Sequence, residues 1–128
     1  MNGPSLFRCP LCGSPLTREE RGCICPARHS FDRAAAGYVH LLPPNRMHSK
    51  APGDDREMVA ARAAFLERGY YAPLRQALEE LVLEASAHLE GPVLLDSGCG
   101  EGYYTAGMFR ALERAGHRPR AAGIDISK

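Results

Sequence analysis

The stretch Val93-Leu94-Leu95-Asp96-Ser97-Gly98-Cys99-Gly100-Glu101-Gly102 joins a short apolar run to a glycine-rich loop, and a helical pattern follows it from Tyr103. Glycines let a chain turn sharply at the carboxyl end of a strand, and they let a ligand approach the backbone where no Cβ intervenes. Strand, loop and helix in this order are typical of the nucleotide-binding loop of a doubly wound domain. We therefore predict an α/β fold whose ligand-binding segment is this loop.

The charge and the spacing of the loop indicate the class of ligand. Asp96 and Glu101 place an acid near each end, and neighbouring carboxylates disfavour the pyrophosphate of a dinucleotide. The spacing Gly-x-Gly-x-Gly also differs from the dinucleotide pattern Gly-x-Gly-x-x-Gly, in which the third glycine packs helix against strand. S-adenosylmethionine carries a sulfonium and an ammonium group instead. The loop therefore predicts a methyl-donor site.

A further acid occurs at the place where nucleotide folds hold the ribose. After the helix expected over residues 103–115, the apolar run 121–126 carries Asp125. An acid about 20 residues beyond such a loop accepts hydrogen bonds from the ribose hydroxyls. Taken singly, Asp96 could be a turn residue and Asp125 a helix N-cap. The order of strand, loop, helix, strand and acid favours the nucleotide interpretation.

Composition excludes several classes of protein. The 128 residues carry a formal net charge of +1, so no overall field draws the chain to nucleic acid or to a membrane. No apolar run approaches the roughly 20 residues of a membrane span, and the first residues lack the pattern of a signal sequence. We expect a cytosolic protein. In that compartment the clustered members of the five cysteines are candidate metal ligands rather than disulfide partners.

The amino-terminal cysteines have the spacing of a zinc site. Cys9 and Cys12 form one close pair, and Cys25 and His29 follow after twelve intervening residues. Zn²⁺ takes four tetrahedral sulfur and nitrogen ligands, and a complete protein set leaves no position for water or substrate. We predict a structural site. Because the segment is short and has little apolar surface, the metal should supply much of its folding free energy.

Cys23 is an alternative ligand. In an extended strand Cys23 and Cys25 point to the same face, so either could reach the ion. We favour Cys25, because a proline follows it as a proline follows Cys9, and because its spacing to His29 is usual for zinc sites. Cys23 is then a small buried or surface thiol.

The remainder of the amino-terminal segment is expected to pack around the metal. Residues 31–43 mix aromatic and aliphatic side chains and are predicted to add a small sheet over the zinc. Positive or chargeable side chains also gather here: Arg28, Arg33, Arg46, His48 and Lys50. They could contact RNA phosphates or form an ordinary solvated surface, and the sequence leaves both open.

Two helices are expected between the metal module and the loop. The turn over residues 51–55 ends in good N-cap residues, and a helical pattern follows it as far as Gly69. A second helix should begin at Pro73 and carry an apolar stripe as far as Leu89, covering one face of the sheet. Tyr70 and Tyr71 lie at the bend, where an aromatic ring either joins the core or closes over bound cofactor.

The carboxyl-terminal part is too short for a whole nucleotide fold. Residues 92–128 can form two strands and one helix, whereas a doubly wound sheet needs about five strands. Two parallel strands leave apolar faces uncovered and edges unpaired. We expect three parts: a metal module over residues 1–45, connecting helices over 46–91 and an incomplete domain over 92–128. The chain should be part of a longer enzyme and inactive alone.

Many short motifs together resemble the bacterial 23S rRNA (guanine-N1)-methyltransferases. They are the four metal-ligand positions, Phe31-Asp32, Gly37-Tyr38-Val39, Leu41-Leu42-Pro43, Pro52-Gly53-Asp54, Met58, Arg62, Phe65-Leu66 and Gly100-Glu101-Gly102-Tyr103-Tyr104-Thr105. The resemblance implies an N-terminal zinc module that helps to recognise an rRNA hairpin. It also implies a Rossmann-like domain that binds S-adenosylmethionine, methylation of N1 of one guanine, and a homodimer.

The resemblance also assigns residues. It implies Cys9, Cys12, Cys25 and His29 as zinc ligands, and it implies cofactor contacts at Tyr71 and across the loop. With the two acids, the predicted cofactor residues are Tyr71, Asp96, Gly98, Cys99, Gly100, Glu101, Gly102 and Asp125. Related branches modify neighbouring guanines, and the sequence does not choose between them or identify a catalytic base. The alternatives are a zinc-ribbon interaction module with a degenerate methyltransferase segment, and a small-molecule methyltransferase.

Overall fold

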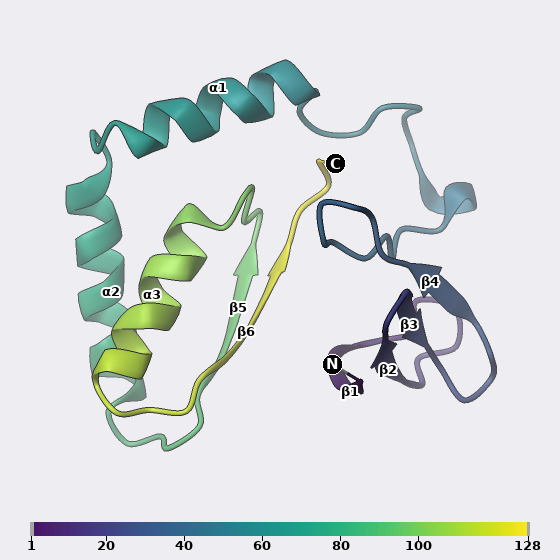
Figure 1. The fold of residues 1–128 in the computed structure, drawn as a ribbon, viewed down its shortest axis with the longest axis horizontal. Helices are drawn as coiled ribbons and strands as arrows, with labels where there is room; N and C mark the ends of the chain where they lie inside the picture. Colours follow the sequence, from purple (N-terminus) through teal and green to yellow (C-terminus); the bar gives the residue numbers. More distant parts are fainter. Residues whose placement is uncertain (1, 128) are drawn as a thin grey trace. The chain divides into compact units, whose positions relative to one another are not determined.

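A computed structural model describes residues 2–127, and these divide into two compact units. The first unit extends to Lys50 and the second begins at Ala51. Both units contain strands, and the second also contains the three α-helices of the described residues, so the fold class is mixed α/β (Figure 1). The finer division at residues 45 and 91 stays a prediction.

The first unit is a small antiparallel sheet. Its four strands pair in the order β1-β2-β3-β4, and they are β1 Gly3–Arg8, β2 Pro15–Glu19, β3 Gly22–Ile24 and β4 Ser30–Asp32. A short 3-10 helix, η1, covers Pro44–Arg46. In β1 half-buried and exposed residues alternate, as expected of a strand with one face on a core.

The core of this unit is small and rich in sulfur. Its buried residues are Cys9, Leu16, Cys23 and Cys25, and Phe7, Phe31, Val39 and Leu41 pack against them. So little buried apolar area cannot by itself offset the conformational entropy of the segment. The predicted sheet over residues 31–43 was only partly right: β4 ends at Asp32, and beyond it only the isolated bridge between Arg33 and Val39 is described.

The first two helices of the second unit begin and end for local reasons. The carboxylate of Asp55 accepts a hydrogen bond from the Met58 amide at 2.9 Å, which caps α1 at Arg56–Glu67. The second helix, α2, covers Ala72–Ser86, with a proline in its first turn. The predicted apolar stripe continues to Leu89, but α2 ends at Ser86. Beyond the helix, the Leu89 carbonyl lies 2.6 Å from the His117 Nδ1 atom.

The remaining elements form a strand–helix–strand unit. Strand β5, Val93–Ser97, pairs in parallel with β6, Arg120–Ile124, and α3, Tyr103–Arg114, connects them. Helix α3 packs on the sheet and buries Gly107, Ala111 and Leu112. Helix α2 packs against α3 rather than directly on the sheet, so the expected covering of the sheet by the connecting helices is indirect (Figure 1).

Helices α2 and α3 approach closely because α3 contains a glycine at the contact. A Cβ at Gly107 would lie 2.6 Å from the Glu79 Oε1 atom and 2.7 Å from the Arg75 Cδ atom. Around this contact Glu79 pairs with Arg75 at 3.3 Å and with Arg114 at 3.8 Å. The Arg75 guanidinium also lies 4.7 Å from the centre of the Tyr103 ring. These contacts hold α2 beside the helix that follows the glycine loop.

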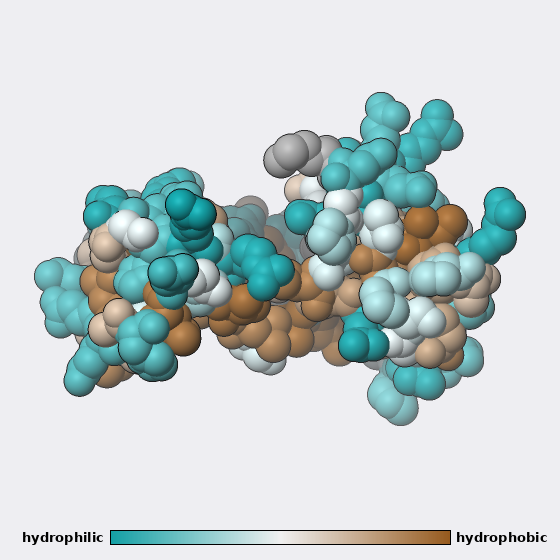
Figure 2. All heavy atoms as spheres, turned by 90° about the horizontal axis from the view of Figure 1, so that it is seen from below, coloured by the Kyte–Doolittle hydropathy of each residue, from teal (hydrophilic) through white to brown (hydrophobic). Residues whose placement is uncertain are grey.

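The second unit also exposes apolar side chains on its sheet. Val93 and Leu95 alternate along β5 and are 54% and 61% exposed, and Ile124 in β6 is 42% exposed. Hydrophobic residues are accordingly visible at the molecular surface in Figure 2. Among residues 2–127 no helix has the length and apolar character needed to cross a bilayer.

Candidate metal centre and cofactor loop

Two tight turns present the predicted zinc ligands. In the first, the Gly13 amide donates to the Cys9 carbonyl at 2.8 Å, and Gly13 has a φ of 72°. In the second, the Arg28 amide donates to the Cys25 carbonyl at 2.8 Å, and Arg28 has a φ of 66°. This left-handed conformation is easy for glycine and unusual for arginine. Each turn curls the chain so that two ligands face the same point.

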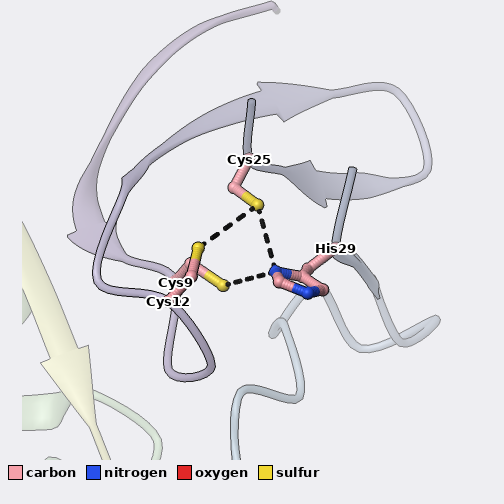
Figure 3. A group of neighbouring side chains, drawn as sticks. All are labelled: Cys9, Cys12, Cys25 and His29. Carbon is pink, nitrogen blue, oxygen red and sulfur yellow. Dashed lines mark hydrogen bonds between the residues drawn. The ribbon is translucent and has the colours of Figure 1, made fainter. Parts of the chain in front are cut away.

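The four ligand atoms converge. The Sγ atoms of Cys9, Cys12 and Cys25 and one ring nitrogen of His29 all lie within 4.8 Å of one another (Figure 3). The Cys12 and Cys25 sulfurs are 3.8 Å apart, and the His29 Nδ1 atom is 3.6 Å from the Cys9 sulfur and 3.4 Å from the Cys25 sulfur. A disulfide would require about 2.05 Å, so the thiols are free.

These separations fit the edges of a zinc tetrahedron. With Zn–S and Zn–N bonds of about 2.3 and 2.0–2.1 Å, tetrahedral geometry separates two sulfurs by ~3.8 Å and a sulfur from a nitrogen by ~3.6 Å. The distances between the side chains lie close to both values. The set of three thiols and one imidazole is therefore suited in both chemistry and size to one Zn²⁺ ion.

The protonation equilibria of two ligands differ because their surroundings differ. Hydrogen bonds from the side chain and backbone of Ser14 lower the pKa of the Cys12 thiol to about 6. Burial raises the pKa of the Cys25 thiol above its ordinary value. Since the thiolate is the form that binds metal, Cys12 would ionise more readily than Cys25, which would have to give up its proton to bind the ion.

Cys23 lies outside this group of converging side chains. It is 6% exposed within the core of the first unit, and burial raises the pKa of its thiol. Cys25, by contrast, contributes its sulfur to the four-ligand cluster. The geometry therefore supports the choice of Cys25 as the ligand and a packing role for Cys23.

In the second unit the glycine loop follows β5 and bends through left-handed backbone. Gly98, Gly100 and Gly102 have φ values of 76°, 54° and 85°. A Cβ at Gly98 or Gly100 would meet no atom of the described chain within 4 Å. The requirement for glycine within the chain itself is therefore conformational, and the space beside these two residues is open to a ligand.

The loop is tied to the end of β6 by its backbone amides. The amides of Gly98 and Cys99 both donate to the Ile124 carbonyl, at 2.8 and 3.0 Å. The Gly100 amide donates to the Asp125 Oδ2 atom at 2.8 Å. Loop and predicted ribose acid are thus in direct contact, and neither can move without affecting the other.

The two other predicted acids have different surroundings. Asp96 accepts a hydrogen bond from the Thr105 hydroxyl at 2.5 Å, which joins the end of β5 to the first turn of α3. Glu101 is exposed at the edge of an open hollow that is also lined by Thr105 and Phe109. Hydrogen bonds from the Ser127 and Gly100 amides lower the pKa of Asp125. Three acidic side chains, Asp96, Glu101 and Asp125, thus lie at this end of the sheet.

The predicted aromatic contact, Tyr71, belongs to a cluster of rings. Its ring meets Phe65 edge-on at 5.7 Å between centroids, and Phe65 stacks on Tyr70 at 5.3 Å. Tyr71 is 44% exposed. Burial raises the pKa of the Tyr104 hydroxyl, and the neighbouring hydroxyls of Tyr103 and Tyr71 raise it further. Tyr71 therefore acts electrostatically on Tyr104, a residue in the first turn of α3.

Two features of the loop were not predicted from the sequence. A Cβ at Gly123 would lie 2.6 Å from the Cys99 sulfur, so this glycine in β6 makes room for the loop cysteine. The Ser127 amide donates to the Asp125 Oδ1 atom at 2.8 Å. An acid followed two residues later by serine is a weak sign of such a turn. No local pattern indicates the contact between Cys99 and Gly123.

Comparisons with known proteins match a family model to the first unit and curated relatives to most of the chain. Residues 7–50 match the family model of the zinc ribbon described as RlmA, N-terminal. The chain is 39% identical over 109 residues to the 23S rRNA (guanine(748)-N(1))-methyltransferase of Streptomyces fradiae, which covers 85% of this chain and 38% of that protein.

Two further relatives carry the provisional name 23S rRNA (guanine-N(1)-)-methyltransferase. The protein from Micromonospora griseorubida is 36% identical over 95% of this chain and 44% of its own length. The protein from Bacillus subtilis is 35% identical over 97% of this chain and 43% of its own length. The chain thus spans about two fifths of the length of the curated relatives it matches. The chain thus matches the RlmA N-terminal zinc ribbon over residues 7–50, and most of its length is similar to part of three proteins named as 23S rRNA (guanine-N1)-methyltransferases.

Proposed function

We propose that this chain supplies the zinc ribbon and the methyl-donor loop of an enzyme that uses S-adenosylmethionine to methylate N1 of a guanine in a 23S rRNA hairpin. The observation that carries the proposal is the contact between the loop and the acid at the end of β6. Open space beside Gly98 and Gly100 gives a ligand access to the loop backbone. The names of the relatives supply the reaction and the substrate class.

Zinc has a structural role in this proposal. Cys9, Cys12, Cys25 and His29 would hold one ion and complete its coordination, so no site remains for a substrate. When bound, the ion cross-links the two turns and stabilises a unit whose apolar core is small. The rigid ribbon would then present its arginines, among them Arg28 and Arg33, to RNA phosphates.

The loop and its acids would hold the cofactor. Asp96 and Glu101 supply the negative charge that suits a sulfonium and an ammonium group. Asp125 would accept the ribose hydroxyls: its two oxygens offer about four lone-pair sites, of which the Gly100 and Ser127 amides use two. Tyr71 would cover the bound cofactor from the corner between α1 and α2. The domain around these residues is proposed to be Rossmann-like.

Methyl transfer to guanine sets two further requirements. N1 of guanine carries a proton and a delocalised lone pair, so the proton must leave as the nitrogen aligns behind the sulfonium methyl group. We assign no base for this step within residues 2–127. The N1 edge is also occupied when guanine is paired, so the target must lie in a loop or be flipped out of a helix.

The crevice for the cofactor and the pocket for guanine would need more than two strands. We therefore expect residues 1–128 alone to transfer no methyl group, and a longer protein that contains them to be active, as a homodimer.

The test is transfer of tritiated methyl from S-adenosylmethionine to a transcript of a 23S rRNA hairpin by the longer protein. Mapping the modified base by a reverse-transcription stop should identify one guanine methylated at N1, since this change blocks pairing. Inosine at that position, which lacks only the 2-amino group, tests recognition of the base. Hairpin binding without cofactor binding or transfer would instead support the interaction-module alternative.

A further inference from the structure

The segment before α1 lies directly against the residue that follows Asp125 and Ile126. A Cβ at Gly53 would lie 2.5 Å from the Ser127 Oγ atom and 2.7 Å from the Ser127 Cα and N atoms. The Asp54 amide donates to the Ser127 Oγ atom at 2.9 Å, across 73 positions of sequence. Only glycine fits at position 53, because of this contact and because its φ is 80°.

Ser127 connects this turn to the predicted ribose acid. Its amide donates to the Asp125 Oδ1 atom at 2.8 Å, and the Asp125 Oδ2 atom accepts from the Gly100 amide at 2.8 Å. Three hydrogen bonds therefore run in series from the Asp54 amide to the glycine loop. The Asp54 carboxylate pairs with the Arg62 Nη1 atom at 2.8 Å, which attaches the turn to α1.

We propose that the turn formed by Gly53 and Asp54 is a positioning element for Asp125 and, through Asp125, for Gly100. The inference rests on the proposed function, since it assigns the loop and the acid to cofactor binding. An exposed carboxylate beyond the end of a strand samples several rotamers when nothing holds it. With one oxygen fixed by Ser127 and the other by Gly100, Asp125 faces the loop before any ligand arrives.

This role also accounts for residues that the zinc site and the loop leave without a function. Pro52-Gly53-Asp54 and Arg62 are among the motifs of the sequence, yet they lie outside both groups of predicted ligands. In the structure Asp54 and Arg62 pair, and Gly53 and Asp54 contact Ser127. They would act on cofactor binding without touching the cofactor, by limiting the movement of the acid that does.

A matched pair of glycine substitutions tests the inference. Gly53→Ala places a methyl group against Ser127, whereas Gly69→Ala has a similar φ of 83° and meets nothing within 4 Å. Both variants place a methyl group on backbone with nearly the same φ, so their difference reports mainly the contact with Ser127. Amide hydrogen exchange of the whole chain by NMR should show Gly100 exchanging roughly five- to tenfold faster in Gly53→Ala than in Gly69→Ala, the effect of losing about one hydrogen bond.

Amides of the ladder between β5 and β6 serve as the internal control, because general destabilisation of the second unit would accelerate them as well. We expect them to exchange equally in the two variants. Equal rates at Gly100 in the two variants, or equal acceleration of Gly100 and the ladder in Gly53→Ala, would overturn the positioning role.

Ser127 provides a second test that introduces no steric collision. Ser127→Ala removes the oxygen that accepts from Asp54 and should accelerate exchange at Gly100, whereas Ser127→Thr keeps the oxygen and should restore the wild-type rate. An unchanged rate in Ser127→Ala would contradict the proposal. Calorimetric titration of the longer protein with S-adenosylmethionine separates the two hypotheses. If the wild-type longer protein binds no cofactor, the cofactor role fails, and the exchange rates still decide the positioning role.

Discussion

The zinc ribbon and the glycine loop arrange their functional groups by opposite means. In the ribbon, four side chains of two short turns converge on one point, and the backbone around them has a small core. In the loop, backbone amides are held by a carbonyl and a carboxylate at the end of the neighbouring strand, and side chains are mostly absent. The first arrangement is completed by its ligand. The second is held by hydrogen bonds within the chain, so loss of ligand should affect the two regions very differently.

Replacement of a zinc ligand should have the largest effect. Cys25→Ser should lose the ion and unfold the first unit while α1, α2 and α3 remain, because structural zinc contributes about 10–16 kcal/mol in comparable small domains. Elemental analysis and NMR of the same sample measure both outcomes. Cys23→Ser is the matched control and should keep one zinc per chain. Retention of zinc by Cys25→Ser together with its loss from Cys23→Ser would show that the ligands have been misassigned.

Removal of the proposed ribose acid should have a smaller and purely local effect. Asp125→Ala in the longer protein should raise the dissociation constant of S-adenosylmethionine by roughly tenfold to a hundredfold, the equivalent of about 1.5–3 kcal/mol for charge-assisted hydrogen bonds. Calorimetric titration measures this change. Zinc content should stay at the wild-type value. An unaltered affinity would mean that the ribose lies elsewhere.

A substitution that disturbs the packing of Cys99 should lower the stability of the second unit by a similar or smaller free energy. Gly123→Ala should destabilise the second unit by about 1–3 kcal/mol, because the new methyl group would overlap the Cys99 sulfur at 2.6 Å. Adding Cys99→Gly removes both side-chain atoms that the methyl group meets and should recover most of the lost stability. Urea unfolding of the single and double variants measures the coupling. If the changes in unfolding free energy caused by Gly123→Ala and Cys99→Gly simply add in the double variant, the loop does not depend on this contact.

The smallest expected effect is the pH dependence of the loop. Because amides of Ser127 and Gly100 lower the pKa of Asp125 in the folded chain, its ionised form stabilises the fold. This contribution is complete above the ordinary carboxyl pKa of about 3.9 and disappears as the pH falls through the lower folded-state value. Exchange at Gly100, corrected for the intrinsic pH dependence, should therefore accelerate only below about pH 4. Asp125→Asn should abolish this acid transition.

Some of these features could be predicted from the sequence because their causes are local. The four metal ligands lie in two short segments, and the spacing within each segment fixes which side chains converge. Asp55 caps α1 through an amide three residues away. The sequence also placed Asp125 at the end of a strand beside the loop, since strand, loop and helix follow one another without a break.

The features that were not predicted depend on residues far apart in sequence. The end of α2 before Leu89 coincides with a contact between the Leu89 carbonyl and His117, 28 residues later. The apolar stripe could not reveal that contact. Gly53 and Gly123 look like ordinary turn and strand glycines, yet each is required by a specific side chain, Ser127 or Cys99. Helical and strand periodicity describe which face is apolar, and they contain no information on such pairs.

The hydrogen bond between Asp54 and Ser127 also limits when this part of the chain can fold during synthesis. Its partners are separated by 73 residues, so the ribosome, which adds about 5–20 residues per second, needs roughly 4–15 s to make the second partner after the first. The zinc ligands are finished long before, at His29, and their unit can fold as soon as it emerges. Until Ser127 has been made and β6 has formed, the Asp54 amide can bond only to water. Folding of the glycine loop into its final shape is therefore a late event, and mutations at Ser127 should slow folding less than they accelerate unfolding.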